Sequence, residues 1–354
     1  MSQIEMFHYL WVAAALWVLY IILDDGKFEF DLEIKSAHIV QLSVQGLIYL
    51  YWCLNSYVIV DRIPLILGQA AFAVLISIAE TYAREGKIKI SAAPIPIVFS
   101  LNFFLWFMPS LFLWQICFLM LALASKQIQC RDPQGNLRHI FNPSGLVLAL
   151  FSWHILFREE IPGLQIHMAL KSLENVPGIH FVIFGLGLAS LWVAERGLVT
   201  LSTLVAIVLI DLLSSKLFGY PVSKYPIHVS VLIGITLLIT DPRTSPSYPL
   251  AQIMFGFAYA LTIVISSSVL YLLRRPAYYD KIMFVPFMNI AAPYLDAWCA
   301  GREFNLPINF KRIALAAYAA IFIMLSFHFD FELGRKQMTV IQLLWPKALA
   351  SAHN

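Results

Sequence analysis

The chain has 354 residues, of which 60% are hydrophobic and only 13% are charged. Soluble domains carry about 25% charged residues, so this chain lacks the polar surface that a water-soluble protein of its length needs. Its net charge of +3 gives no reason to expect nucleic acid as a partner. The composition therefore predicts an all-α integral membrane protein whose first partner is the lipid bilayer.

Apolar runs recur along the chain at about the 20-residue length that crosses a bilayer as a helix. They cover about 7–23, 38–60, 63–82, 109–125, 143–157, 178–194, 198–218, 250–273 and 311–329. Three more are short or contain proline, at about 91–108, 226–240 and 282–298. We predict a polytopic transmembrane helical bundle of about ten to twelve membrane segments, some of them broken half-helices.

The polar loops between these runs are too short to separate two soluble domains. We predict transmembrane helices over 1–88, a membrane core over 89–298, and a last helix with an interfacial or disordered tail over 299–354. The first apolar run follows no Lys or Arg and precedes no small-residue cleavage motif, which favours a membrane span over a signal peptide. The four cysteines show no metal or disulfide spacing and are expected to be unpaired thiols.

Basic residues give conflicting information on orientation. Two basic loops, around 84–89 and 126–138, are separated by two segments, so both are expected on one side of the membrane. The positive-inside rule favours the cytoplasm for that side. Arg274, Arg275 and Lys281 fall on the opposite side by the same count, unless a re-entrant segment has been counted as a span.

The stretch Arg138-His-Ile-Phe-Asn-Pro-Ser-Gly145 opens an apolar run. Asn142 is suited to cap a helix, Pro143 to occupy its first position, and Ser144 to admit a close neighbour. One interpretation is simple helix capping. The other is that a membrane-embedded helix N-terminus, with free N–H groups and a positive dipole end, holds an anionic or electron-rich ligand group.

A second break, Thr240-Asp-Pro-Arg-Thr-Ser-Pro246, directly follows an apolar run. Asp241 is expected to end the helix, because a residue before proline disfavours the α region, and Thr244 or Ser245 to cap a new turn. A charged surface turn is the simpler alternative. Asp211 and Asp296 are further candidates, because ionisable groups at membrane depth are costly and often functional, although both lie near the ends of their runs.

The two halves of the chain share an order of features. In the first, Phe141-Asn-Pro-Ser-Gly145 follows a short segment, a span and a polar loop; in the second, Met288-Asn-Ile-Ala-Ala-Pro293 does so. Each half therefore ends on a break with Asn, Pro and small residues. This order is typical of an inverted-repeat membrane fold, in which broken helices form a binding site, and it adds Asn289 to the candidates.

These motifs resemble, in order and spacing, those of the NqrB/RnfD family. Its members are membrane subunits of the Rnf electron-transport complex and of the Na⁺-translocating NADH:quinone reductase. The resemblance rests on 141–147, 228–244, Phe255-Gly256 and 287–296, with Lys89 and Lys126 upstream, and covers about 89–298. It implies inverted repeats, electron transfer through membrane-bound flavin, partner redox subunits, and a multi-pass protein of the bacterial inner membrane.

One family feature is missing. The family carries covalent flavin mononucleotide on a threonine, and the loop 158–177, where that threonine is expected, contains none. The chain is thus similar to divergent UnbU-type members, and covalent flavin is not expected. A non-covalent flavin (FMN or riboflavin) or a quinone is expected at the paired breaks instead, held by Asn142, Pro143, Ser144, Asp241, Thr244, Asn289 and Asp296.

Three functions stay open on sequence grounds. The first is an electron-transferring component of a membrane redox system. The second is a small-solute transporter or channel, since inverted repeats with half-helices also line solute pathways. The third is a structural membrane subunit that only anchors partners. No catalytic residue and no metal site is predicted, so at most the chain is an electron-transferring or non-catalytic subunit of an oxidoreductase.

Overall fold

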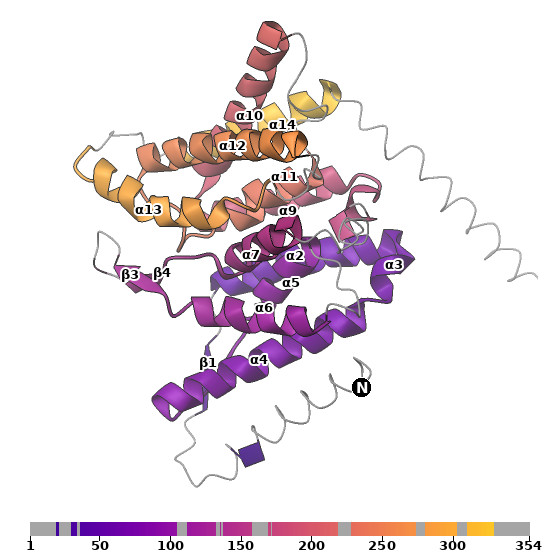
Figure 1. Ribbon diagram of the computed structural model, residues 1–354, viewed down its shortest axis with the longest axis vertical. Coiled ribbons are helices and arrows are strands. Elements are labelled where there is room, and N and C mark those ends of the chain that lie inside the picture. The colour runs from indigo at the N-terminus through magenta and orange to yellow at the C-terminus, as the bar shows by residue number, and fades with distance from the viewer. Residues whose placement is uncertain are drawn as a thin grey trace, which may run out of the picture.

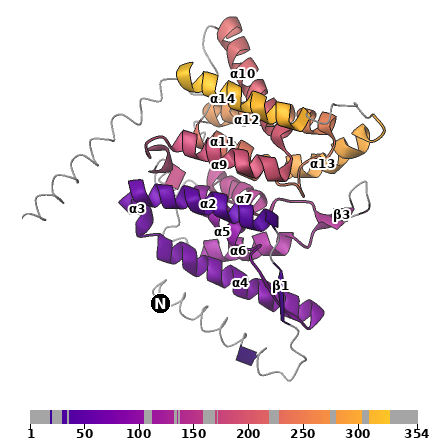
Figure 2. The same cartoon turned by 180° about the vertical axis from the view of Figure 1, so that it is seen from behind.

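A computed structural model describes residues 19–20, 30–33, 36–104, 112–131, 135, 137–157, 169–170, 172–218, 228–273, 280–302 and 310–328. Nearly all of the predicted first span, Arg274 and Arg275, most of the loop 158–177 and the tail after Asp330 lie outside these residues. Most described residues are helical, which confirms the all-α prediction. Figures 1 and 2 show most helices lying side by side in an elongated stack.

The helices of the first half are α2 (Ser36–Asn55), α3 (Tyr57–Val60), α4 (Ile63–Glu85), α5 (Ile95–Phe104), α6 (Phe112–Ser125) and α7 (Pro143–Phe157). Those of the second half are α9 (Ile179–Ala194), α10 (Gly197–Phe218), α11 (Val229–Ile233) continued by the π-helical η2 (Gly234–Leu238), α12 (Pro249–Leu272), α13 (Val285–Cys299) and α14 (Phe310–His328). Three stretches are long and apolar enough to cross a membrane: Tyr57–Glu85, Gly197–Lys216 and Pro249–Leu270.

Local sequence explains where these helices begin and end. Proline in the first turn starts α4, α7 and α13, where its missing N–H costs no intrahelical bond. Gly86 ends α4 in the left-handed conformation, at φ 65°, and its N–H bonds the Tyr82 carbonyl. The short apolar runs at 91–108 and 226–240 give short helices, ten residues in α5 and five each in α11 and η2.

Strands form two small ribbons. β1 (Phe30–Glu33) pairs in parallel with β2 (Ile88–Ser91), and β3 (Gln129–Arg131) pairs antiparallel with β4 (Leu137–His139). The β3–β4 ribbon projects on one side of the stack, at one set of helix ends, and α3 lies on the opposite side, at the other set (Figure 1). We call these the hairpin end and the α3 end. At the hairpin end Gln127 contacts both Arg84 and Glu80, so the two basic loops lie close together.

The helices pack around one continuous apolar core. α10 and α12 approach each other very closely at Gly256. A Cβ atom at this position would lie 2.0 Å from the Ser202 hydroxyl and 2.5 Å from the Val199 carbonyl. Only glycine fits there, which explains the Phe255-Gly256 element in structural terms. The four cysteines are free, as expected.

The helix contacts repeat between the halves. In the first half α5 packs on α2 and α4, and α6 packs on α4 and α7. In the second, α11 and η2 pack on α9, η2 also packs on α10, and α12 packs on α10 and α13. The contacts of α2 with α9 and of α7 with α13 join the halves. This correspondence matches α2, α4, α5, α6 and α7 with α9, α10, α11–η2, α12 and α13.

The predicted helix break at Met288–Pro293 is wrong. Pro293 lies inside α13, so the stretch Met288–Pro293 is continuous helix and opens no new segment. The structural counterpart of Arg138-His-Ile-Phe-Asn-Pro143 is Lys281-Ile-Met-Phe-Val-Pro286, with a basic residue, phenylalanine and proline at equal spacing before each helix. The motif of Asn, Pro and small residues does not break the helix here, and the Asn289 side chain binds neighbouring segments instead.

Candidate functional site

The predicted break at Asn142 is a true helix start. The Asn142 Oδ1 atom accepts hydrogen bonds from the Gly145 N–H at 3.0 Å and from the Ser144 hydroxyl at 2.8 Å, and so caps α7. Pro143 is the first residue of α7, as predicted. Gly145 allows α13 to approach, since a Cβ there would lie 2.8 Å from Val285 Cγ1.

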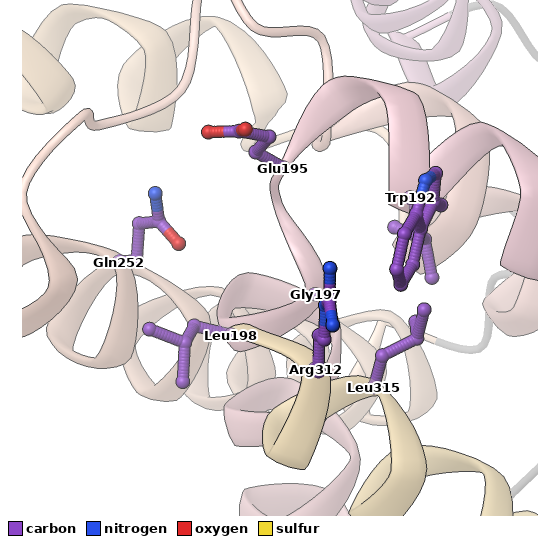
Figure 3. Close-up of a pocket in the computed structure, with 8 residues that line it drawn as sticks. Trp192, Glu195, Gly197, Leu198, Gln252, Arg312 and Leu315 are labelled. Atoms are coloured by element: carbon purple, nitrogen blue, oxygen red, sulfur yellow. The ribbon is translucent and has the colours of Figure 1, made fainter. Parts of the chain in front are cut away.

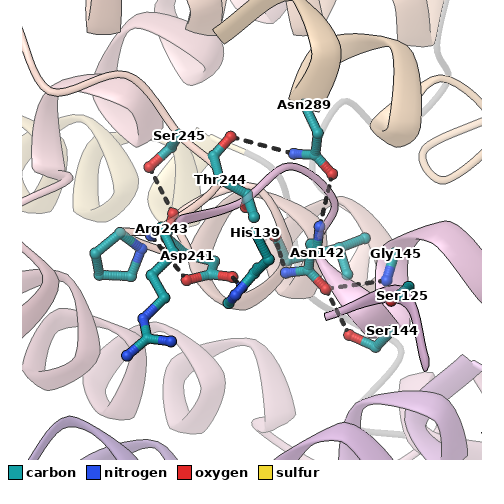
Figure 4. A network of polar contacts seen from close by, with 12 residues as sticks. Ser125, His139, Asn142, Ser144, Gly145, Asp241, Arg243, Thr244, Ser245 and Asn289 are labelled. Carbon is teal, nitrogen blue, oxygen red and sulfur yellow. Dashed lines mark hydrogen bonds and ion pairs between the residues drawn. The ribbon is translucent and has the colours of Figure 1, made fainter. Parts of the chain in front are cut away.

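Asn142 also ties this helix start to the second half of the chain. Its Nδ2 atom donates to the Leu238 carbonyl at the end of η2, at 2.8 Å. Its backbone N–H donates to Asn289 Oδ1 at 3.0 Å, and Asn289 Nδ2 donates to the Thr244 carbonyl at 3.3 Å. Three predicted positions far apart in sequence therefore meet in one buried network, drawn in Figure 4.

Asp241 organises the loop after η2. Its backbone carbonyl accepts from the N–H groups of Thr244 and Ser245, and its Oδ1 atom accepts from the Arg243 N–H at 3.0 Å. His139 Nε2 lies 3.5 Å from Asp241 Oδ2. Burial raises the pKa of the Asp241 carboxyl, but the contacts with His139 and Arg243 outweigh it and hold that pKa below its usual range.

Asp296 lies apart from Asn142 but also connects α13 to the segment before α7. It is fully buried, and its Oδ1 atom accepts from the N–H groups of Ser247 and Tyr248, just before α12. Its Oδ2 atom lies 3.4 Å from Arg138 Nη2, and Arg138 is itself 7% exposed. A buried carboxylate that is paired and accepts backbone hydrogen bonds is electrostatically satisfied.

The contacts between α7 and α13 set their relative direction. Arg138, Asn142 and Gly145 follow one another along the chain, and they contact Asp296, Asn289 and Val285 in that order. The two helices therefore run antiparallel. Asn289, which binds Asn142, and Asp296 are seven residues apart on α13. Measured along the α13 axis, Asn142 therefore lies about 10 Å from the Arg138–Asp296 pair.

Sequence reasoning missed two members of this cluster, Arg196 and His139. Arg196 Nε donates to the Ser245 hydroxyl at 2.8 Å and its Nη2 donates to the Pro242 carbonyl at 3.0 Å, which fastens the Asp241 loop to the start of α10. Burial lowers the pKa of this guanidinium, against the nearby charges of Asp296 and Asp241. The sequence signal that could have identified Arg196 is the charged pair Glu195-Arg196 in the short link between two apolar runs.

Asp211 is the candidate that the structure leaves out. It lies on α10, eleven residues after Thr200, whose hydroxyl donates to the Ile235 carbonyl of η2 at 2.7 Å. Eleven helical residues place Asp211 about 16 Å farther along α10. Its backbone carbonyl accepts from Ser214 within the helix. It takes no part in the network around Asn142.

The network uses nearly all of its polar groups internally. Both atoms of the Asn142 amide, both atoms of the Asn289 amide and both oxygens of Asp241 have protein partners. The Thr244 hydroxyl is the exception: Thr244 is 2% exposed and its Oγ1 atom has no hydrogen-bond partner among the described residues. The described residues of this cluster thus form a closed hydrogen-bonded network between the halves, centred on Asn142, Asp241, Thr244 and Asn289, which we call the latch. Its one unpartnered hydroxyl in the described part of the chain is that of Thr244.

The described residues contain no group of three or more His, Cys, Asp or Glu side chains placed to hold a metal ion. Comparisons of the chain with protein-family models, with curated proteins and with solved structures found no match.

Proposed function

We propose that the chain is a polytopic membrane protein with two sets of helices inserted in opposite directions, and that it serves as a membrane component of a redox assembly. The observation that carries this proposal is the antiparallel pair α7–α13. In it, the motifs that resemble redox subunits meet in space and join the halves. Such a pair, with corresponding helix contacts on each side, is what an inverted repeat produces.

Exposed side chains support the membrane setting. Large apolar residues face outward on both halves; examples are Leu54 and Tyr57 at 74% and 78% exposed, and Leu272 and Tyr294 at 78% and 72%. Helices that face lipid ordinarily expose large apolar side chains in this way. Three described stretches have the length and hydropathy to span a bilayer.

Basic residues support an orientation. Arg84, Lys126, Arg131 and Arg138 lie at the hairpin end, and Arg196 lies there too, bound to the Asp241 loop. By the positive-inside rule the hairpin end faces the cytoplasm. A membrane protein so oriented presents its β3–β4 ribbon to cytoplasmic redox partners.

The closed latch favours a structural scaffold over a solute channel. A pathway between the helix breaks needs polar groups turned toward water, and here the amides and carboxylates are turned toward each other. The same network supports a cofactor only at Thr244. A non-covalent flavin or quinone at this break would take the Thr244 hydroxyl as donor to a ring carbonyl.

The test is purification from native membranes with bound partners and cofactors retained. Flavin is read by absorbance and fluorescence, quinone by extraction, and partners by mass spectrometry. The proposal expects redox-protein partners, and Thr244→Val is expected to lower any bound flavin or quinone while Thr81→Val, on α4, leaves it unchanged. Flux of small polar solutes into liposomes, with neither redox partners nor cofactor, would overturn the proposal in favour of a transporter.

A further inference from the structure

Ionisable side chains from several segments meet in a second cluster, none of whose members belongs to the latch. The link before α9 supplies Glu174, the residue before α11 is His228, and the segment before α13 supplies Asp280 and Lys281. His228 Nδ1 lies 3.8 Å from Glu174 Oε1. Lys281 Nζ lies 2.6 Å from Asp280 Oδ1. The Lys281 charge acts on both Glu174 and His228, and that of His180, in the first turn of α9, acts on His228.

The link that carries Glu174 is fixed to the last turns of α2. Trp52 Nε1 donates to the Ser172 hydroxyl at 3.3 Å, and the Tyr51 hydroxyl donates to the Pro177 carbonyl at 2.8 Å. Glu174 lies between these two anchors in the chain, and α3 follows α2 directly, so the cluster lies at the α3 end. An anchored backbone places a side chain at a lower entropic cost than the mobile side chains of an ordinary surface ion pair pay.

The segment that carries Asp280 and Lys281 is fixed to α12. The Ser266 hydroxyl donates to the Asp280 carbonyl at 2.9 Å, and the Ser267 hydroxyl donates to the Asp280 carboxylate. The Tyr259 hydroxyl donates to the Lys281 carbonyl. Asp280 and Lys281 are both buried. A carboxylate and an ammonium in contact balance each other's charge, so this pair adds no net charge to the cluster.

Glu174 and His228 therefore decide how much charge the cluster carries. Their side chains are 27% and 39% exposed, so water reaches them. With the carboxylate ionised and the imidazole neutral, the two groups carry one negative charge, and one added proton removes it. Burial raises the pKa of the Glu174 carboxyl, against the charge of Lys281, and burial also disfavours the protonated imidazole. The proton affinities of a carboxylate and an imidazole, ordinarily well separated, approach each other here.

We propose that Glu174 and His228 form a proton-binding site at the α3 end, in which the carboxyl and imidazole groups hold one proton between them. In the loaded site the proton is either on the carboxyl oxygen, which donates to His228 Nδ1, or on the imidazole, which donates to the carboxylate. Release of the proton to water leaves the carboxylate and a neutral imidazole. A proton needs no cavity, because it occupies the contact between the two groups.

The experiment is ¹⁵N NMR of the full chain in nanodiscs with ring-labelled histidine, in which the His228 signals are assigned by their loss in His228→Gln. Two groups that share a proton titrate as a pair, in one step for each proton that the pair takes up. We expect two steps for His228 in the wild type and one step in Glu174→Gln. The matched control is Glu195→Gln. Glu195 follows α9 at its other end, where it lines a pocket of about 340 Å³ (Figure 3), and this variant is expected to keep both steps.

A second variant tests the site without changing Glu174. Asp280→Asn combined with Lys281→Gln removes the positive charge that acts on both groups and leaves no unpaired charge in the buried pair. Both steps of the His228 titration are expected to move to higher pH by about one unit, a tenfold rise in proton affinity. A single step in the wild type, two steps in Glu174→Gln, or an unchanged titration in the double variant would overturn the inference.

The proton-binding site is independent of the latch and of any cofactor at Thr244. In nanodiscs both ends of the protein meet the same buffer, so the titration reports the site whichever way the chain is inserted. A negative result would therefore remove the proton-binding site and leave the proposed function and orientation as they stand.

Discussion

Asn142 gives the sharpest test of the latch. Replacing it by alanine removes the cap of α7 and the hydrogen bond to the Leu238 carbonyl, but keeps the backbone bond to Asn289. Loss of a helix N-cap costs about 1 kcal/mol. The Leu238 carbonyl, 2% exposed with its residue, loses a side-chain donor, which costs about 1–3 kcal/mol in a buried setting. We therefore expect Asn142→Ala to lower the free energy of unfolding by about 2–4 kcal/mol.

Two further variants divide this effect. Asn142→Ser keeps a capping oxygen and loses the reach to η2, so it is expected to cost about 1–3 kcal/mol. Asn55→Ala removes an asparagine bond within α2, to the Tyr51 carbonyl, and is expected to change stability by about 0.5 kcal/mol or less. The assay is denaturant unfolding in mixed micelles followed by tryptophan fluorescence. If Asn142→Ala unfolded like Asn55→Ala, the latch would not join the halves.

Three other predictions concern the packing and charge around the latch. Asp296→Ala leaves Arg138 buried without its carboxylate and is expected to cost about 3–5 kcal/mol in unfolding free energy, whereas replacing both residues by leucine and methionine recovers most of the loss. Gly256→Val places atoms within 2.0 Å of the α10 hydroxyl neighbour and is expected to lower the melting temperature and the yield of folded protein; an unchanged melting temperature would contradict the close α10–α12 contact. Burial lowers the pKa of Lys126 to about 8 in the folded protein, whereas its pKa in the unfolded chain is near 10.4, so the free energy of unfolding is expected to rise between about pH 8 and pH 10.4. The pH of half-maximal acylation of Lys126 is expected near 8 in folded protein and near 10.4 in denaturant. The same half-maximal pH in both would refute this prediction.

Part of the site was predictable because local chemistry determines it. Asn142 before Pro143 marks a helix start from sequence alone, and Asp241 before Pro242 marks a helix end. The structure has α7 begin at Pro143 and a turn at Asp241. That Asn142 and Asp241 lie near Asn289 in space could be inferred only from the order of the motifs along the chain.

The remainder could not be predicted because it depends on contacts between distant segments. Pro293 reads as a helix break, yet α13 continues through it from Val285 to Cys299. In the first half, Gln69 donates to Gln115 at 2.8 Å and accepts from Asn102 at 2.8 Å, all three buried. These amides are scattered through apolar runs, and no spacing in the sequence shows that they face one another.

We propose that the chain crosses a bilayer with its hairpin end in the cytoplasm. The direct measurement is labelling by a membrane-impermeant maleimide in a chain whose four native cysteines are replaced. Single cysteines are placed at Asp61, exposed at the α3 end, and at Gln129, exposed on β3. We predict that Asp61→Cys reacts in intact cells and Gln129→Cys only after permeabilisation. Reaction of both from the same side would contradict it.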